Sequence, residues 1–101
     1  MSAAPPEIDG ARVVYYATVD DDVQPTGNTR HLLGAESEMM GPAKALAICQ
    51  YPGEQCFYLY YCDEHWGVLT DTLHESLTQA MDQAEFEYRG VSDHWQSDAN
   101  P

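Results

Sequence analysis

The amino-acid sequence predicts an α+β domain, in which an antiparallel sheet of about four strands carries one long C-terminal helix on one face. Two observations lead to this fold class. Short segments rich in β-branched and aromatic residues are separated by turn residues, a pattern typical of antiparallel hairpins. One apolar stripe at helical spacing follows the last of these segments. A chain of 101 residues is long enough for one such domain with one core.

The first strand is expected at Arg12 to Val19, where R-V-V-Y-Y-A-T-V combines β-branched and aromatic residues. We expect its side chains to alternate strictly between the two faces, and the aspartates at 20–22 to end it. Residues 1–10 contain small residues and two prolines, so a flexible arm is expected there. The single domain is then expected over residues 11–95, with a flexible tail at 96–101.

Residues 23–42 give the weakest pattern of the chain. A proline, a glycine and an asparagine mark a turn at 25–28. We consider a short edge strand at 29–33 and one helical turn at 36–40. A loop of this length in a small domain is either functional or contains an element that the pattern does not reveal.

Two strands are expected at Ala45 to Tyr51, where a short helix is the alternative, and at Cys56 to Cys62. Pro52 and Gly53 between them suit the second and third positions of a type II turn, so the two strands should form a hairpin. A second turn at 63–65 leads to a further strand at Trp66 to Thr70.

The helix is predicted over Leu73 to Arg89. Thr72 and Glu75 have the spacing of a capping box, and Gly90 suits a left-handed residue at the helix end. We expect residues 91–95 to fold back on the core, with the tryptophan as anchor. The apolar stripe consists of Leu73, Leu77, Ala80, Met81, Ala84 and Tyr88.

The motifs F-Y-L-Y-Y-C-D-E-H-W and D-T-L-H-E-S-L…Q-A-E-F-E-Y-R-G resemble those of short, uncharacterised bacterial proteins. The resemblance covers Phe57 to Val91, roughly the last half of the chain. It carries no known activity, ligand or catalytic residue. What it implies is a bacterial, cytosolic origin.

Seventeen acidic residues against four basic ones give a net charge of −13. From Glu54 onward there are ten acidic residues and one basic residue, Arg89. Such a surface repels phosphate backbones and anionic head groups, so we expect neither direct nucleic-acid binding nor membrane binding. It attracts a basic protein and accelerates their encounter. The alternative is that the charge only keeps a small protein in solution.

The three cysteines lack the spacing of a secreted disulfide framework, and the first ten residues lack the basic and apolar regions of a signal peptide. No apolar run approaches the roughly 20 residues of a membrane span. We therefore expect a cytoplasmic protein with reduced thiols.

Cys62 and His65 have a C-x-x-H spacing, and His74 follows. A structural zinc site needs four ligands, usually in two close pairs, and the second pair is missing. Consecutive aspartates at 20–22 point to opposite sides, which is unfavourable for Mg²⁺ or Ca²⁺. We therefore predict no metal and no cofactor. The same cysteine and histidines are the only combination of nucleophile and base that lies close together in the sequence. No nucleophile elbow or oxyanion loop accompanies them, so we predict that the chain is not an enzyme.

Tyr58 and Tyr60 share one face of the aromatic strand, and Phe57, Leu59 and Tyr61 share the other. The helix can cover only one of these faces, and the sequence leaves open which. The other face needs cover from the long preceding segment, a second copy or a partner. Tyrosine is enriched in interfaces, so Tyr58 and Tyr60 are candidate partner-binding residues, although tyrosines at a sheet margin with hydroxyls in water are equally common.

Phe86 lies on the helix opposite the apolar stripe, among Glu75, Gln79 and Asp82. A single exposed aromatic residue is common. An aromatic residue within an acidic patch is also what a binding hot spot for a basic partner looks like. These four residues complete the candidate site.

Together these features predict a small acidic protein-binding module, such as an inhibitor or immunity-type partner of a basic nuclease or toxin. One alternative is a structural homo-oligomer, for example a homodimer, that pairs through the aromatic sheet face. A second alternative is a metal or thiol enzyme that uses Cys62, His65 and His74.

Overall fold

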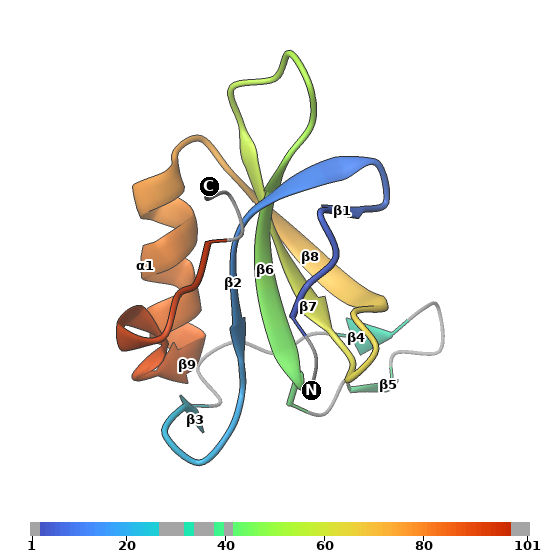
Figure 1. Cartoon of the computed structure of the whole chain (residues 1–101). Helices are drawn as coiled ribbons and strands as arrows, with labels where there is room; N and C mark the ends of the chain where they lie inside the picture. Colours follow the sequence, from blue (N-terminus) through green and yellow to red (C-terminus); the bar gives the residue numbers. More distant parts are fainter. Residues whose placement is uncertain (1–2, 27–31, 34–37, 40–41, 98–101) are drawn as a thin grey trace.

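In the computed structural model, which describes residues 3–26, 32–33, 38–39 and 42–97, a five-stranded antiparallel sheet curls into a half-barrel and one helix packs against it (Figure 1). The strand order is β1-β2-β6-β7-β8, and the helix α1 spans Leu77–Glu87. The predicted α+β class is confirmed, with five strands in the main sheet rather than about four. These strands are β1 (Glu7–Ile8), β2 (Ala11–Thr18), β6 (Ala45–Gln50), β7 (Phe57–Cys62) and β8 (Val68–His74).

Two short ladders and a 3-10 turn complete the described part of the chain. β3 (Gln24–Pro25) pairs with β9 (Tyr88–Arg89), and β4 (Leu32–Leu33) pairs with β5 (Glu38–Met39). The 3-10 turn η1 spans Val91–Asp93. Among the described residues, no helix is long and apolar enough to cross a membrane.

The long segment at 23–42 contributes to the core through Val23, which is 1% exposed. β4 agrees with the second half of the edge strand predicted at 29–33, whose first three residues lie outside the described residues. The helical turn predicted at 36–40 is wrong at β5, where the backbone pairs with β4. The other residues of that prediction lie outside the described residues.

The central hairpin β6–β7 forms as the sequence predicts. The Glu54 amide donates to the Tyr51 carbonyl oxygen over 3.2 Å, and Gly53 has φ 81° in the intervening turn. Pro52 and Gly53 thus occupy the second and third turn positions, where a fixed φ and a positive φ are required. The residues of β6 from Ala45 to Cys49 are all buried, because both faces of this strand are covered.

A β-bulge breaks the regular alternation predicted for β2. The register with β6 shifts between Val13 and Tyr15, so Val14 is the extra residue. Val13 and Tyr16 consequently face one core, while Ala17 faces the other. The prediction of strict alternation is wrong because an inserted residue reverses the face of everything that follows it.

The predicted helix start is wrong, because Leu73 belongs to β8. Leu73 pairs with Tyr58 on β7 and is 59% exposed. The alternating, threonine-rich segment V-L-T-D-T-L-H gains backbone pairing with β7 at Val68 and from Thr70 to His74, with a bulge at Leu69. That ladder outweighs the helical spacing of a single leucine. The capping box predicted at Thr72 and Glu75 is therefore absent.

The helix begins one turn later, with Ser76 as its N-cap. The Ser76 Oγ accepts from the Gln79 amide over 3.1 Å, and Gln79 Oε1 accepts from the Glu75 amide over 3.0 Å. This reciprocal S-x-x-Q arrangement satisfies two amides that have no partner within the helix. Ala80 and Ala84 are fully buried against the sheet.

The segment after the helix folds back on the core, as predicted. Gly90 has φ 96°, although two residues of β9 separate it from the helix end. Val91 is fully buried and Trp95 packs against the same core. Gln96, predicted in the flexible tail, exchanges backbone hydrogen bonds with Tyr16 over 2.8 and 2.9 Å.

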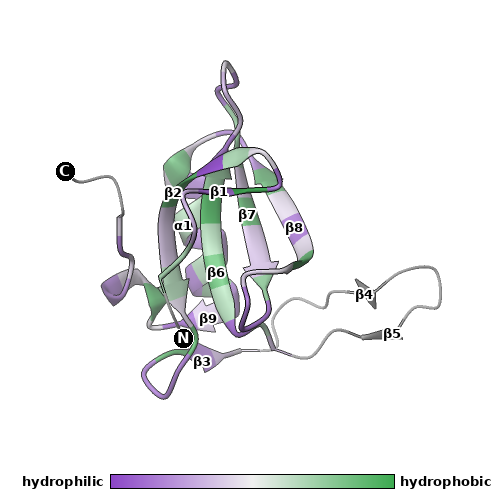
Figure 2. Ribbon diagram, turned by 45° about the vertical axis from the view of Figure 1, so that its right-hand side comes forward, coloured by the Kyte–Doolittle hydropathy of each residue, from purple (hydrophilic) through white to green (hydrophobic). Residues whose placement is uncertain are grey.

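The N-terminal segment packs on the sheet, which differs from the predicted arm. Ala4 and Ile8 are 5% and 6% exposed. The Pro6 carbonyl accepts from the Val13 amide over 2.9 Å, and β1 adds the fifth strand. Residues 3–10 therefore belong to the packed domain. Figure 2 shows the apolar residues concentrated in the middle of the sheet, around β6, with β8 at its margin.

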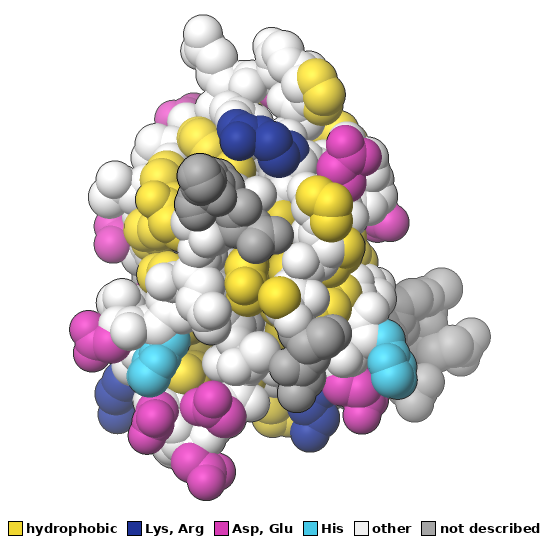
Figure 3. Space-filling model, in the orientation of Figure 1, with side chains coloured by type: hydrophobic (Ala, Val, Ile, Leu, Met, Phe, Trp, Pro, Cys, Tyr) yellow, Lys and Arg dark blue, Asp and Glu magenta, His cyan; other side chains and the backbone are white. Residues whose placement is uncertain are grey.

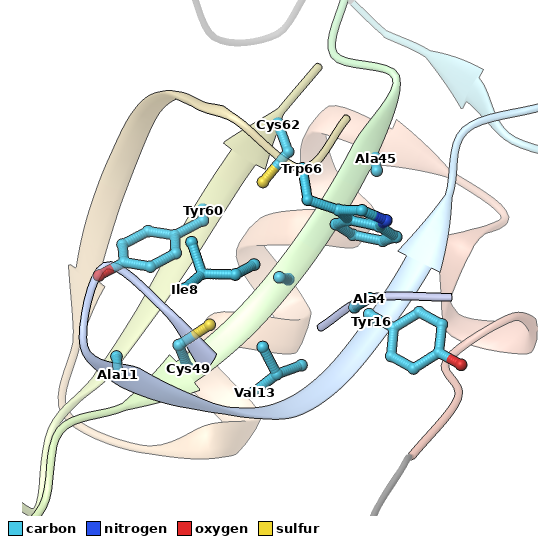
Figure 4. Packing of buried hydrophobic residues seen from close by; sticks show 11 residues of the cluster. Ala4, Ile8, Ala11, Val13, Tyr16, Ala45, Cys49, Tyr60, Cys62 and Trp66 are labelled. Carbon is cyan, nitrogen blue, oxygen red and sulfur yellow. The ribbon is translucent and has the colours of Figure 1, made fainter. Parts of the chain in front are cut away.

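The two faces of the sheet have separate cores. The N-terminal core, drawn in Figure 4, lies under the segment that includes β1, and the helix-side core lies under α1. The N-terminal core contains Ala4, Ile8, Ala11, Val13, Tyr16, Ala45, Ala47, Cys49, Tyr60, Cys62 and Trp66. The helix-side core contains Ala17, Val23, Ala43, Leu46, Ile48, Leu59, Tyr61, Ala80, Ala84, Tyr88 and Val91. The helix thus covers the face of Leu59 and Tyr61.

Candidate functional site

The six predicted partner-binding residues divide between two separate surfaces. Tyr58 and Tyr60 lie on the side of the N-terminal core, and the other four lie on α1 or just before it. The sheet stands between the two groups (Figure 1). One flat interface therefore does not contain both.

Tyr60 is covered by its own chain. Its side chain is 2% exposed, and its hydroxyl lies 3.1 Å from the Tyr51 hydroxyl, which donates to the Asp9 carbonyl oxygen. Ile8 and Ala11 belong to the same packed cluster, and Figure 4 shows both beside the Tyr60 ring. Burial, together with the Tyr51 hydrogen bond, raises the pKa of Tyr60, so the hydroxyl stays protonated. Tyr60 is not available to a partner.

Tyr58 remains accessible at the margin of this cluster. It is half-buried, and its ring meets the Tyr51 ring edge-to-face with centroids 5.3 Å apart. A second contact, with the Tyr60 ring at 6.1 Å, holds it from the other side. Two aromatic contacts fix the ring while part of it faces solvent, which suits a rigid contact residue.

The helix face predicted from the sequence is present and exposed. Glu75, Gln79, Asp82 and Phe86 are all exposed, and Phe86 is 54% exposed. The spacing of three and four residues places Gln79, Asp82 and Phe86 along one side of the helix, and Glu75 lies just before its N-cap. The backbone beneath Phe86 is fixed, because the Thr26 hydroxyl donates to the Phe86 carbonyl oxygen over 2.7 Å.

A neighbouring carboxylate, Glu85, supports the chain that follows the helix. It accepts from the Gly90 amide over 2.8 Å and from the Ser92 amide over 3.0 Å. Partial burial opposes ionisation, but these two amide donors outweigh it and hold the pKa of Glu85 below its usual range. Glu85 therefore anchors η1 against α1 rather than adding a free charge to the exposed face.

Beneath the helix lies a buried polar cluster that the sequence analysis missed. Glu87 is 4% exposed, accepts from the Tyr61 hydroxyl, and accepts from Gln83 Nε2 over 2.7 Å. Burial and the adjacent Glu87 carboxylate raise the pKa of Tyr61. A signal was present, because Glu87 follows Ala80 and Ala84 at spacings of seven and three residues, on the buried side. The cluster fixes the helix on the sheet.

Two of the three residues of the enzyme alternative, Cys62 and His74, lie at opposite ends of β7. His74 pairs with Phe57 at the start of β7, whereas Cys62 is at its end, about 17 Å along the strand. Burial raises the pKa of Cys62 to about 12, so this thiol is neither an activated nucleophile nor a ready metal ligand. His65 is exposed in the β7–β8 turn. Across the described ranges, no three His, Cys, Asp or Glu side chains group as a metal site would require.

That turn has a structural role of its own. The Asp63 carboxylate accepts from the His65 and Gly67 amides, each over 2.8 Å. These amides lower the pKa of Asp63. They also hold Trp66 at φ 65°, from where its ring packs edge-to-face on Tyr16 in the N-terminal core. The turn thus closes one end of that core.

A shallow hollow of about 360 Å³ lies between the β1–β2 and β6–β7 turns. Arg12 contributes a positive charge there, and Glu7 and Glu54 contribute two negative ones. None of the predicted site residues lines it. The remaining lining residues are Gly10, Gln50, Tyr51, Pro52 and Gly53.

Carboxylates are spread around the molecule rather than collected in a cleft. On the face drawn in Figure 3 they lie around the margin of a central apolar area. The aspartates at 20–22 are exposed in the turn after β2, where the Asp22 amide donates to the Asp20 side chain over 3.2 Å. This acidic turn is therefore a self-capped loop.

No protein-family model, no curated protein and no solved structure matches this chain. The resemblance of residues 57–91 to short bacterial proteins stays a prediction.

Proposed function

We propose that this chain is a small acidic module that binds a basic protein through the exposed face of α1. The surface consists of Glu75, Gln79, Asp82 and Phe86. The observation that carries the proposal is Phe86, a large aromatic side chain that is 54% exposed on a helix whose exposed neighbours are acidic or polar. An aromatic anchor with a polar surround is the usual composition of an interface hot spot.

The charge of the whole chain supports a basic partner. A net charge of −13 accelerates association with a positively charged protein and opposes association with another copy. Carboxylates on this surface, Asp82 on the helix and Glu75 just before it, can also occupy the phosphate-binding positions of a nuclease. An inhibitor or immunity-type partner of a basic nuclease or toxin, acting in the bacterial cytoplasm, is the class that fits these properties.

The two alternatives have less support. The homo-oligomer requires an exposed aromatic sheet face, but Tyr60 is covered by the N-terminal segment of its own chain. The metal or thiol enzyme needs Cys62, His65 and His74 together, but the register of β7 and β8 separates His74 from Cys62. Cys62 is also buried while His65 is exposed. We therefore prefer the binding module.

The test compares two charge-altered variants in quantitative affinity capture. A helix-face variant combines F86A, E75Q and D82N, and a control variant combines D20N, D21N and D22N in the remote acidic turn. We expect a basic partner that wild type and control retain and that the helix-face variant loses by about tenfold or more. The control variant neutralises three carboxylates and the helix-face variant neutralises two. If charge attraction alone determined binding, the control would therefore bind the partner more weakly than the helix-face variant. Equal capture by all three folded proteins would contradict the proposal.

A further inference from the structure

The strand β8 forms one edge of the main sheet. Among the described residues, β7 is its only hydrogen-bonded neighbour, so the amides and carbonyls along its other side have no strand partner. β8 extends over seven residues, from Val68 to His74, and lies at the margin of the sheet in Figure 2. An unpaired edge of this length is a template for an added strand.

The side chains of β8 give this edge a definite pattern. Leu69, Asp71 and Leu73 are all exposed and alternate with the half-buried Thr70 and Thr72. Leu69 is 37% exposed and Leu73 is 59% exposed, which makes them two of the three exposed large hydrophobic residues in the described chain. Asp71 and Leu73 share one face, whereas Leu69 is the extra residue of a β-bulge, because the register with β7 shifts from Tyr61–Thr70 to Cys62–Val68. The exposed residues of the edge therefore read apolar, acidic, apolar along the chain.

The neighbouring strand extends the apolar part of this face. Leu73 lies directly opposite Tyr58, which two aromatic contacts hold in place, and Asp71 lies opposite Tyr60. Asp71 thus lies beside Leu73 on the face that Tyr58 and Tyr60 share. It is the one charged residue of the strand.

This pattern opposes pairing with a second copy. In an antiparallel pair of β8 strands, the register that sets Leu69 opposite Leu73 also sets Asp71 opposite the second Asp71. Like charges directly opposite each other are destabilising. A register shifted by two residues sets Asp71 opposite a leucine instead. The net charge of −13 opposes self-association further.

We propose that β8 binds an extended segment of a basic partner as an additional strand. The segment carries a lysine or arginine opposite Asp71, an apolar residue opposite Leu73, and a second apolar residue toward the bulged Leu69. Its intervening residues are small and polar, because they lie beside Thr70 and Thr72. The basic partner is shared with the proposed function, on which this inference rests, but the surface is different, so each can fail alone.

The test uses two synthetic peptides, acetyl-TLTKTLT-amide and acetyl-TLTETLT-amide, titrated into the full chain and followed by the amide resonances of β8. We expect the lysine peptide to shift resonances at 68–74 and to bind about tenfold more tightly than the glutamate peptide. The variant Asp71→Lys should reverse this preference. The matched control, Asp21→Lys in the exposed turn after β2, changes the net charge equally and should preserve the preference.

Three outcomes would overturn the inference. The lysine peptide could fail to bind, or D71K and D21K could weaken its binding equally, which would mean net-charge attraction alone. Protection of the β8 amides in a dimer of the free protein would identify a second copy as the occupant. Asp71→Asn replaces D71K if the latter does not fold, with loss of the preference expected. Capture by the helix-face variant is measured separately, so its failure and that of the peptide experiment are distinguishable.

Discussion

The two faces of the sheet are covered in different ways. The N-terminal core is covered by a short segment next to β2 in the chain, and two side chains of this segment, Ala4 and Ile8, are buried in it. The helix-side core is covered by α1, whose position is fixed by the buried carboxylate of Glu87 as well as by apolar contacts. A short terminal segment fixed by few contacts can open locally, whereas the helix is tied to the sheet at several points.

The contrast is sharpest at two adjacent tyrosines of β7. Tyr60 faces the N-terminal core, and its hydroxyl is hydrogen-bonded to the Tyr51 hydroxyl. Tyr61 faces the helix and donates to the Glu87 carboxylate, away from water. The same residue type therefore hydrogen-bonds another hydroxyl on one face and a buried carboxylate on the other.

Thiol reactivity should show the largest difference within the molecule. Cys49 and Cys62 lie in the N-terminal core, where burial raises the pKa of each to about 12, while Cys56 is only half-buried. With Ellman's reagent in native buffer, we expect one fast thiol and two that react at least about a hundredfold more slowly. The variant Cys56→Ser should remove the fast phase.

The same measurement reports how firmly the N-terminal segment closes its core. Ile8→Ala should accelerate the Cys49 reaction more than it accelerates global unfolding, because local opening exposes this thiol. Identical acceleration of both processes would show that the segment opens only when the whole domain unfolds.

Truncations in the two cores should differ in their effect on stability. Leu59→Ala removes a fully buried side chain from the helix-side core and should lower the free energy of unfolding by about 2–5 kcal/mol. Ile8→Ala should cost about 2 kcal/mol or less, because a terminal segment can relax into the space. Urea denaturation measures both. An equal loss for the two variants would mean that the two faces are equally rigid.

Removing one hydroxyl tests the tyrosine pair. Tyr61→Phe leaves the buried Glu87 without its hydroxyl donor and should cost about 1–3 kcal/mol. Tyr60→Phe is the matched control on the adjacent residue, and it should cost about 1 kcal/mol or less because Tyr51 keeps its bond to the Asp9 carbonyl. A larger loss for Tyr60→Phe would reverse the comparison of the two faces.

Local sequence signals predicted the fold class, the central hairpin and its turn. The helix start was wrong, because the spacing of Leu73 fits a helix, whereas hydrogen bonding to β7 is a long-range effect that favours the strand. The bulge at Val14 was missed for a related reason, since its register depends on β6. The role of the N-terminal segment depends on where β1 docks, which composition alone does not reveal.

The candidate site was predictable where it depends on helix periodicity alone. Gln79, Asp82 and Phe86 are exposed as expected, because a single amphipathic helix defines its own outer face, and Glu75 is exposed just before the helix. Tyr60 was misjudged, because its exposure depends on a segment fifty residues away in the chain. The Tyr61–Glu87 contact joins a strand to a helix end, and no local pattern encodes it.

The smallest effect is expected in the pH dependence of stability. Partial burial lowers the pKa of His74, whose Nε2 lies 2.7 Å from the Thr72 hydroxyl. In the unfolded chain the imidazole binds a proton near pH 6.5. The unfolded state therefore binds more protons than the folded state as the pH falls below this value, and stability declines there. Above it, both states are neutral and this contribution is complete.

His74→Gln should remove the part of the stability loss at low pH that comes from this imidazole. The resulting change in the free energy of unfolding should be smaller than that caused by Tyr61→Phe. Urea midpoints are measured from pH 7.5 to pH 5 for wild type, H74Q and H65Q, a control at an exposed histidine. All three proteins have the same carboxylates, so a difference between their curves reports the histidine alone. We expect H65Q to follow the wild-type curve and H74Q to be flatter. Parallel curves for wild type and H74Q would show that the imidazole is as well solvated in the folded chain as in the unfolded one. The β8–helix junction would then be more open to water than the Thr72 contact indicates.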